Sequence, residues 1–458
     1  MVATGVVYAQ SGSERRLEDH VTALTGPQMQ GRRVGTDGHE LAQNYVVKQF
    51  EAAGLKPAGT DGWFTPSTIV WNVQSARSTE LRPNGKLLAR GVDYRPLGFS
   101  DDIGVEADAV FVGYGISDPV AGWDDYAGQD VRGKIVVALS DAPVGDVIAE
   151  GKTSDDAKAA TALSKGAAGF LLINAPRTHG DRPEQRPDEL GRMRPSQALT
   201  GLSAGRMTLR AAEAMLAESG FDLSELQAGI DTNGAASFPL DLEIKMTLAV
   251  EREEVEVNNV VGAFAGTGPP VVLGAHYDHL GDGIVGSLWT GEPRVHPGAD
   301  DNASGVSVVI EVARQLRDKD HRRPIVITAT TGEEIGLRGA RRLSRTIESR
   351  GAVYINLDMV GRLRNPGLRV LGLDRSPGLR KSVRDAAKSA NVTIITGALY
   401  DSSSDHLAFA ESGFDALHVT TGRHPDYHQP TDTADRLNLP GMRTVTQFVA
   451  DLVHTIAR

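Results

Sequence analysis

No cysteine occurs anywhere in the chain. Its absence excludes disulfide bonds, thiolate nucleophiles and cysteine-based zinc sites, so a bound metal would need His, Asp and Glu as ligands. No run of 18 apolar residues occurs either, which predicts that no helix spans a membrane. Basic residues are outnumbered, 48 against 59 acidic ones, and the net charge of -11 argues against a nucleic-acid partner.

What the chain does contain is the composition of an ordinary globular protein, with 40% hydrophobic and 23% charged residues. Its 458 residues predict two or three domains. Residues 1–12 form a terminal segment in which Val7-Tyr8-Ala9 resembles the small-residue end of a secretory signal, although a basic start and a full apolar core are missing. We expect an exported protein, periplasmic or secreted. A cytoplasmic protein with a disordered terminus is the alternative.

The pattern along the chain changes twice. The spacing of apolar residues predicts two helices in residues 14–54, and aromatic and β-branched runs predict strands in residues 63–112. Residues 104–240 alternate strands and helices of their own, include a polar loop from Pro176 to Pro195 and hold few of the 12 histidines. We therefore expect residues 104–240 to be a module inserted into a main domain that is formed by residues 13–103 and 241–458.

From residue 250 onward, short apolar strands alternate with helices. The expected strands are Val271–Ala275, Ile325–Ala329, Val353–Leu357, Leu368–Leu371 and Ala416–Val419, and the expected helices are Ser304–Arg317, Leu379–Ser389 and Pro440–Ile456. This alternation predicts an α/β fold with a mostly parallel open sheet and helices on both of its faces.

Metal-binding side chains follow most strands of this last block. They are His276, Asp278, Asp300, Asp301, Glu333, Glu334, Asp358 and His428. One such residue at a strand end is usually structural, but several independent segments are hard to explain in that way. Because the carboxyl ends of parallel strands meet at one edge, these acids would repel one another unless cations neutralise them. The sequence therefore predicts a two-metal hydrolytic centre.

Two other motifs point to different chemistry and are rejected. Gly281–Gly286 spells the G-x-G-x-x-G of a dinucleotide site, but Gly291 and Pro293 exclude the helix that should follow it. Gly201–Gly205 spells the G-x-S-x-G of a serine hydrolase, but the residues before it, Arg192–Gln197, do not form a buried strand.

The full set of motifs resembles a known family. HYDHLG, GADDNASG, TGEEIGLRGA, INLDMVGR and YHQPTDT are similar, in order and approximate spacing, to motifs of the zinc-dependent aminopeptidases of the M28 class. RRVGTDGHELAQNYVVKQFEAAGL resembles the opening helix of that family. The middle block, with VGYGI, GKIVV and SKGAAGFLLIN, resembles a protease-associated (PA) domain. The resemblance implies a zinc-peptidase/phosphorylase-like fold that carries an inserted α/β PA domain, whose position suggests that it shapes access to the cleft.

Carried over residue by residue, the resemblance implies two zinc ions per chain and five ligands: His276 and Asp358 on one ion, Glu334 and His428 on the other, and Asp301 between them. It selects Asp301 rather than Asp300, because the family places the bridging carboxylate directly ahead of an Asn/Asp-small-Ser-Gly turn. Imidazole and carboxylate ligands suit zinc.

The resemblance also implies the remaining roles. Glu333 would be the general base and would help to hold the free amine of the substrate. Asp278 would orient His276, and Tyr427 would donate a hydrogen bond to the oxyanion. Ser404-Asp405-His406 would line the site.

The function expected on these grounds is removal of the N-terminal residue from peptides that have a free amino terminus. A carboxypeptidase or a glutaminyl cyclase of the same fold is the alternative, although cyclases use one zinc ion and the ligand set here argues for two. A non-catalytic PA/peptidase-like binding protein is a further alternative, and it conflicts with the complete ligand set, which without metals would be a costly group of buried charges. The preferred side chain, the physiological metal and the oligomeric state do not follow from the sequence.

Overall fold

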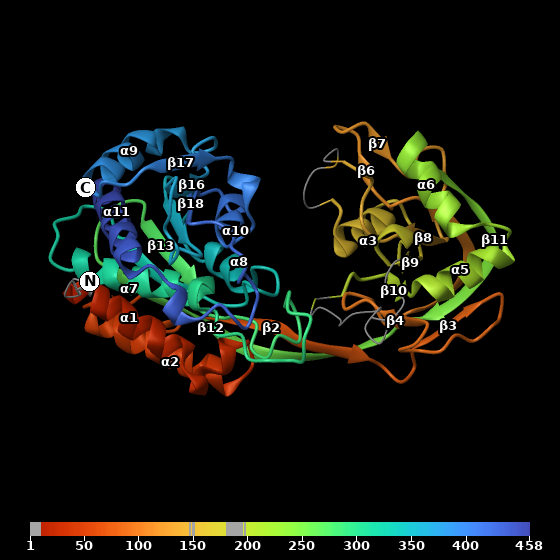
Figure 1. Ribbon diagram of the computed structural model, residues 1–458, viewed down its shortest axis with the longest axis horizontal. Helices are drawn as coiled ribbons and strands as arrows, with labels where there is room; N and C mark the ends of the chain where they lie inside the picture. The colour runs from red at the N-terminus through yellow and green to blue at the C-terminus, as the bar shows by residue number, and fades with distance from the viewer. Residues whose placement is uncertain (1–10, 146–147, 149–151, 180–195, 197) are drawn as a thin grey trace, which may run out of the picture. The chain divides into compact units, whose positions relative to one another are not determined.

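The computed structural model describes residues 11–145, 148, 152–179, 196 and 198–458, which form two compact units (Figure 1). The first unit combines Met1–Ile69 with Val255–Arg458, and the second is Val70–Glu254. The signal-like start and most of the polar loop Pro176–Pro195 lie outside the described residues.

A nine-stranded sheet forms the centre of the first unit. Its strands follow the order β1-β12-β14-β13-β15-β18-β16-β17, and β2 also pairs with β12. The strands β13, β14, β15 and β18 are mutually parallel, whereas β12 runs antiparallel to β14, and β16 runs antiparallel to β18. The bounds are β1 (Lys56–Pro57), β2 (Phe64–Ser75), β12 (Val250–Phe264), β13 (Val271–His276), β14 (Ile325–Thr330), β15 (Val353–Leu357), β16 (Leu368–Leu371), β17 (Ile394–Gly397) and β18 (Asp415–Thr420).

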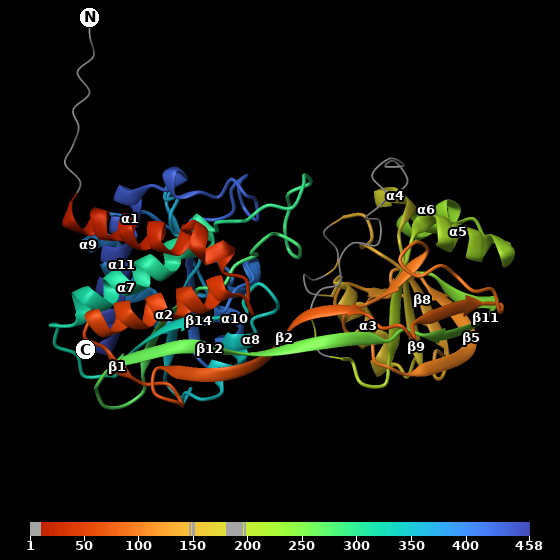
Figure 2. The ribbon, with the colours of Figure 1, turned by 90° about the horizontal axis from the view of Figure 1, so that it is seen from below.

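Helices cover both faces of this sheet, as the sequence pattern predicts (Figure 1, Figure 2). One face packs against α1 (Gly12–Thr25), α2 (Asp37–Ala52), α7 (Gly305–Leu316), α9 (Arg380–Ser389) and α11 (Leu439–Ala457). The other packs against α8 (Arg338–Ser344) and α10 (His406–Glu411). Because successive side chains of a strand point to opposite faces, Leu273 of β13 joins the first core and Val272 joins the second.

The helix ends are explained by local sequence. At the start of α1, Ser11 and Glu14 form a reciprocal capping box, and Thr36 caps α2 through the N–H of His39. Short turns of other types connect the main elements: η1 (Pro27–Arg32), η3 (Ala299–Ser304), η4 (Pro377–Leu379), η5 (Leu399–Asp401) and η6 (Ala434–Arg436).

The second unit has a seven-stranded sheet of its own, in the order β3-β11-β5-β8-β9-β10-β4. Its helix α3 packs on one face, and α5 and α6 pack on the other. The bounds are β3 (Glu80–Pro83), β4 (Tyr94–Pro96), β5 (Gly104–Val112), β8 (Ile135–Leu139), β9 (Gly169–Ile173), β10 (Ser203–Met207), β11 (Ser237–Thr247), α3 (Asp155–Ser164), α4 (Pro176–His179), α5 (Leu209–Glu218) and α6 (Leu223–Asn233). A small separate hairpin joins β6 (Ser117–Asp118) to β7 (Trp123–Asp124).

The unit boundaries differ from the expected ones at residues 103/104 and 240/241. They lie at 69/70, inside β2, and at 254/255, inside β12. The reason is strand pairing: β3 pairs with β11, and β4 pairs with β10, so residues 80–96 belong to the second sheet. That residues 104–240 are a PA domain stays a prediction.

The first unit has a reversal of strand order at β13. This strand lies between β14 and β15, so the chain leaves β13 toward one neighbour and later returns to the other. The helix that follows β13 packs on one face and the helix that follows β14 packs on the other. Such a point of reversal is where open α/β sheets bind ligands.

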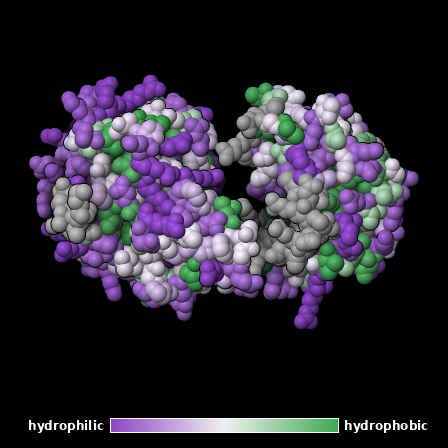
Figure 3. Space-filling model, viewed as in Figure 1, coloured by the Kyte–Doolittle hydropathy of each residue, from purple (hydrophilic) through white to green (hydrophobic). Residues whose placement is uncertain are grey.

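The hydropathy of the surface residues is that of a packed domain. On the side seen in Figure 3, the first unit shows mostly hydrophilic residues, with apolar ones in small patches. Within the described part of the chain, no helix combines the length and the apolar character needed to cross a membrane.

Candidate metal centre

Five of the predicted ligands come from five different segments that meet beyond the carboxyl end of β13. His276 is the last residue of β13, and Asp358 follows β15 directly. Glu334 lies in the turn after β14, Asp301 in η3 ahead of α7, and His428 in the loop after β18. Residues that are up to 152 positions apart in the chain are thus brought to one place by the sheet.

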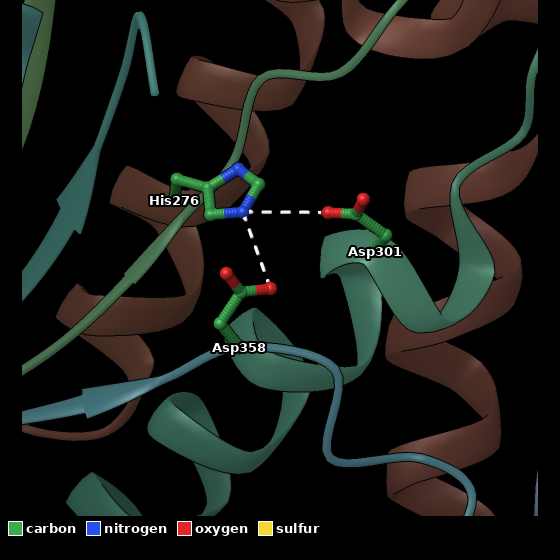
Figure 4. Close-up of side chains that lie close together, drawn as sticks. All are labelled: His276, Asp301 and Asp358. Atoms are coloured by element: carbon green, nitrogen blue, oxygen red, sulfur yellow. Dashed lines mark ion pairs between the residues drawn. The ribbon is translucent and has the colours of Figure 1, made fainter. Parts of the chain in front are cut away.

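The first group consists of His276, Asp301 and Asp358 (Figure 4). The Nε2 atom of His276 lies 3.4 Å from Oδ1 of Asp301 and 3.5 Å from Oδ1 of Asp358. The side chains of His276 and Asp301 are buried, and that of Asp358 is 13% exposed. All three therefore point at one small volume.

The second group shares Asp301 with the first. The Nε2 atom of His428 lies 3.2 Å from Oδ2 of Asp301 and 3.2 Å from Oε2 of Glu334. Asp301 thus turns one carboxylate oxygen toward each histidine, which is the geometry of a carboxylate that bridges two cations.

The separations within both groups fit metal ligands better than direct hydrogen bonds. Two ligands of one tetrahedral zinc ion, each at roughly 2.0–2.2 Å, lie about 3.3–3.5 Å apart. Charged N–H···O bonds are shorter, roughly 2.7–2.9 Å. Nε2 of His276 and Oδ1 of Asp358 are moreover buried with no hydrogen-bond partner among the described residues. Both observations fit a cation held by His276, Asp301 and Asp358.

The electrostatics of the cluster favour positive charge. Burial opposes the charged form of His276, yet Asp358, Glu333 and Asp301 raise its pKa well above the usual value. His428 behaves in the same way: burial works against its charge, but Glu334 and Asp301 raise the pKa of His428 to about 11. An acid cluster that attracts protons to imidazole this strongly also attracts metal cations.

His279 also belongs to the cluster, and the sequence analysis assigned it no role. Its Nδ1 lies 2.7 Å from Oε1 of Glu334, and His279 forms a further potential metal-holding group with Asp301 and Glu334, which also belong to the second group. The motif HYDHLG contains this residue, three positions after His276. The local spacing alone does not show that the loop turns it back toward Glu334.

Glu333 and Glu334 both face the cluster because of the turn that precedes them. Gly332 adopts a φ of +69°, and a Cβ atom on it would lie 2.7 Å from Cδ1 of Ile69. This left-handed residue redirects the chain so that adjacent carboxylates need not point in opposite directions. Burial, opposed by His276 and reinforced by Glu334, raises the pKa of Glu333 well above its ordinary value.

Asp278 contacts His276 differently from the expectation. Nδ1 of His276 lies 3.2 Å from the main-chain oxygen of Asp278 but 3.8 Å from its carboxylate. The carboxylate instead accepts the backbone N–H of Glu333 at 3.3 Å. The main chain of residue 278 therefore orients the imidazole, and the buried side chain of Asp278 fixes the Glu333 turn.

Tyr427 and the Ser404–His406 segment lie around the cluster. The ring of Tyr427 stacks on His428 with centroids 3.8 Å apart. Burial and the carboxylates of Asp301, Glu334 and Glu333 raise the pKa of Tyr427, which keeps its hydroxyl protonated. Ser404 accepts a hydrogen bond of 2.8 Å from Asn356, and the buried Asp405 accepts one from Thr330 at the end of β14.

Asp300 points away from the cluster, in agreement with the choice of Asp301. Its Oδ1 accepts the N–H of Gly361 at 2.6 Å, and its Oδ2 lies 3.2 Å from Nε2 of His424. The structure also agrees with rejection of the two other motifs. Ser203 begins the strand β10 and its Oγ accepts the N–H of Leu248 at 3.1 Å, and no helix lies between Gly281 and η3.

Comparison with known proteins finds similarity to one peptidase family over part of the chain. Residues 259–453 match the model of peptidase family M28. The chain is 32% identical over 171 residues to aminopeptidase YwaD of Bacillus subtilis, which covers 34% of this chain and 37% of that protein. It is 35% identical over 146 residues to a "Probable zinc metalloprotease" of Pyrenophora teres f. teres, covering 31% of this chain and 29% of that one. The matches thus span about a third of the length of these curated relatives.

Solved structures resemble the whole fold. The aminopeptidase from Aneurinibacillus sp. strain AM-1 superposes with a TM-score of 0.63 at 21% identity, over 97% of this chain and 94% of that one. The zinc aminopeptidase BSAP from Bacillus subtilis gives a TM-score of 0.55 at 19% identity, over 98% and 96%. At these identities the likeness shows the fold. The match to the M28 model is confined to residues 259–453, which contain all five predicted metal ligands.

Proposed function

We propose that the protein is an aminopeptidase that removes the N-terminal residue of peptides through a co-catalytic pair of zinc ions. The family and the printed names of its relatives support the reaction class and the metal. The observation that carries the two-ion centre is the position of Asp301, with Oδ1 at 3.4 Å from His276 and Oδ2 at 3.2 Å from His428.

The five side chains divide into two overlapping sets. His276 and Asp358 would hold one ion, Glu334 and His428 would hold the other, and Asp301 would belong to both sets. When bound, such a pair lowers the pKa of a shared water toward neutrality and polarises the scissile carbonyl. Three carboxylates offset most of the charge of two divalent cations, so the site is close to neutral when it is filled.

Glu333 performs the proton transfers. Its carboxylate accepts a proton from the attacking water and donates it to the nitrogen of the leaving amine. A carboxylate whose pKa is raised by burial has the proton affinity that this role requires. The hydrogen bond from its own N–H to Asp278 keeps the turn in place during both transfers.

Tyr427 and the acids beside it bind the reacting ends of the substrate. The protonated hydroxyl of Tyr427 donates a hydrogen bond to the oxyanion of the tetrahedral intermediate. Glu333, the carboxylate of the cluster that is not a proposed ligand, accepts a hydrogen bond from the amino terminus of a peptide. An amino-terminal substrate therefore fits the charge of the site better than a carboxylate does.

Hydrolysis of a panel of aminoacyl-p-nitroanilides tests the proposal, with N-acetylated analogues and carboxypeptidase substrates as controls. Zinc-loaded protein, chelator-treated protein and Glu333→Gln are compared. We expect turnover of free-amine substrates alone, loss of activity with chelator, and a fall in kcat of about 10²–10⁴-fold in Glu333→Gln. Cleavage of blocked or carboxyl-terminal substrates would show that the substrate end is wrong. Full activity after chelation would refute the metal centre.

A further inference from the structure

Arg362 joins three carboxylates that are not metal ligands. It lies four residues after Asp358, and its side chain is only 12% exposed. Nη1 donates to Oδ2 of Asp426 at 2.6 Å and Nη2 donates to Oδ1 of Asp432 at 2.6 Å, while Nε lies 3.9 Å from Oδ2 of Asp300. One guanidinium thus connects the segment after β15, the loop after β18 and the turn ahead of α7.

Asp432 carries this connection to the bridging ligand. While its Oδ1 contacts Arg362, its Oδ2 accepts the backbone N–H groups of Asp300 at 2.8 Å and Asp301 at 3.1 Å. The side chain of Asp432 is 1% exposed, so water does not compete for these bonds. The carboxylate of Asp432 therefore contacts both the backbone of Asp301 and the guanidinium of Arg362.

Asp426 carries the connection to the histidine ligand. Its Oδ1 accepts the hydroxyl of Thr431 at 2.7 Å, and its main-chain oxygen accepts the N–H of Gln429 at 3.0 Å. These two bonds close a turn that contains His428. Arg362 contacts the first residue of this turn, so it fixes where the turn stands relative to the Asp301 peptide.

We propose that Arg362 is a positioning residue that sets the separation of Asp301 and His428, and thereby the affinity of the site for the ion that His428 holds. The proposal rests on the proposed two-ion function. A planar guanidinium fork can contact two carboxylates in fixed directions, whereas a lysine ammonium offers a single point of charge. Buried ion networks often add little net stability, so a role in positioning explains the network better than a role in stability alone.

Arg362→Lys tests this, because it keeps the charge and removes the fork. The chelator-treated full-length chain is titrated with Co²⁺, whose visible absorption reports ligand geometry as well as occupancy. We expect the wild type to take up two equivalents. In Arg362→Lys one equivalent should bind roughly 10–100-fold more weakly, with a changed spectrum, as is usual when a residue that supports a ligand is altered.

Arg436→Lys is the matched control. Arg436 also contacts Asp426, at 3.2 Å, but its side chain is 50% exposed and no contact of it with Asp432 or Asp300 is found within the described residues. The Arg436→Lys variant should bind Co²⁺ with the affinity and spectrum of the wild type. If Arg362→Lys fails to fold, Asp426→Asn, which leaves the pair of Arg362 and Asp432 intact, should show the same selective weakening.

Three results overturn the proposal. Wild-type Co²⁺ affinity and spectrum in Arg362→Lys, with only a lower melting temperature, would show a purely structural role. Equal weakening in Arg436→Lys would show that any altered arginine contact of Asp426 has this effect, and not the fork of Arg362 in particular. A wild-type chain that takes up no Co²⁺ would refute the two-ion function itself, and that result is distinct because it does not depend on any variant.

Discussion

Arg32→Met offers a quantitative test of how the loops around the site are held. The guanidinium of Arg32 is fully buried and donates to four main-chain oxygens, those of Leu24 at 2.7 Å, Tyr277 at 2.9 Å, Pro297 at 2.7 Å and Gly298 at 2.9 Å. Burial lowers the pKa of Arg32 to about 10, so the side chain is still charged at neutral pH. Three of the acceptors lie beside metal-binding residues in the chain: Tyr277 follows His276, and Pro297 and Gly298 shortly precede Asp301.

The size of the effect follows from these four bonds. A hydrogen bond from a charged donor contributes roughly 1.5–3 kcal/mol net, and a buried acceptor left without a donor costs about 1–3 kcal/mol. Methionine keeps the apolar stem and removes the cost of burying the charge, which offsets part of the sum. We expect Arg32→Met to lower the free energy of unfolding by about 3–5 kcal/mol and to weaken metal binding.

Urea unfolding followed by circular dichroism measures the loss, with Arg15→Met as the control. Arg15 is exposed on α1, so its replacement should change stability by no more than about 0.5 kcal/mol. A loss below about 1 kcal/mol in Arg32→Met would refute the view that these four bonds hold the loops.

Three further predictions concern other parts of the first unit. Glu311→Gln should lower the free energy of unfolding by roughly 1–2 kcal/mol, because the buried carboxylate of Glu311 accepts two hydrogen bonds of 2.8 Å from Arg16. The loss is moderate because the side chain of Arg16 is 42% exposed and solvent screens its charge. An unchanged urea midpoint would contradict this prediction. Burial lowers the pKa of His20 from 6.5 to about 4, so the unfolded chain takes up a proton that the folded chain does not, and stability is lost as pH falls from about 6.5 toward 4. His20→Gln should remove about 2 kcal/mol of the difference in unfolding free energy between pH 7 and pH 5, and an unchanged pH dependence would speak against it. Gly332→Ala should lower the free energy of unfolding by roughly 1–2 kcal/mol, because the φ of Gly332 is +69° and the new Cβ would contact Ile69. It should also reduce kcat more than it changes KM. A kcat equal to that of the wild type would refute the role of this turn.

Two matched substitutions separate these effects from general ones. Gly378→Ala adds a Cβ that meets no atom within 4 Å, so it should leave kcat unchanged. Glu348→Gln removes an exposed carboxylate and should not shift the urea midpoint.

The elements of the first unit could be predicted where hydrophobic periodicity is strong. The expected strand Val353–Leu357 coincides with β15, and the expected helix Pro440–Ile456 differs from α11 by one residue at each end. β15 is buried at every residue and forms a continuous apolar run, whereas α11 buries one face and follows the period of a helix. The grouping of metal-binding residues could be predicted for a similar reason, because parallel strands bring their carboxyl ends together.

Features that depend on long-range pairing could not be predicted in this way. The unit boundaries lie inside the long strands β2 and β12, so no loop or turn in the sequence marks them. The contacts of Arg362 join residues 64 and 70 positions away, and no local spacing encodes them. Whether Asp278 uses its carboxylate or its main chain toward His276 is decided by one side-chain rotamer.

The central claim is that one carboxylate holds two zinc ions together. The zinc content of purified, zinc-saturated protein, measured by inductively coupled plasma mass spectrometry for the wild type and Asp301→Ala, tests it most directly. The account predicts two zinc ions per wild-type chain and fewer than one per Asp301→Ala chain, with the circular dichroism spectrum unchanged. A wild-type chain without zinc, or an Asp301→Ala chain that still holds two ions, would contradict it.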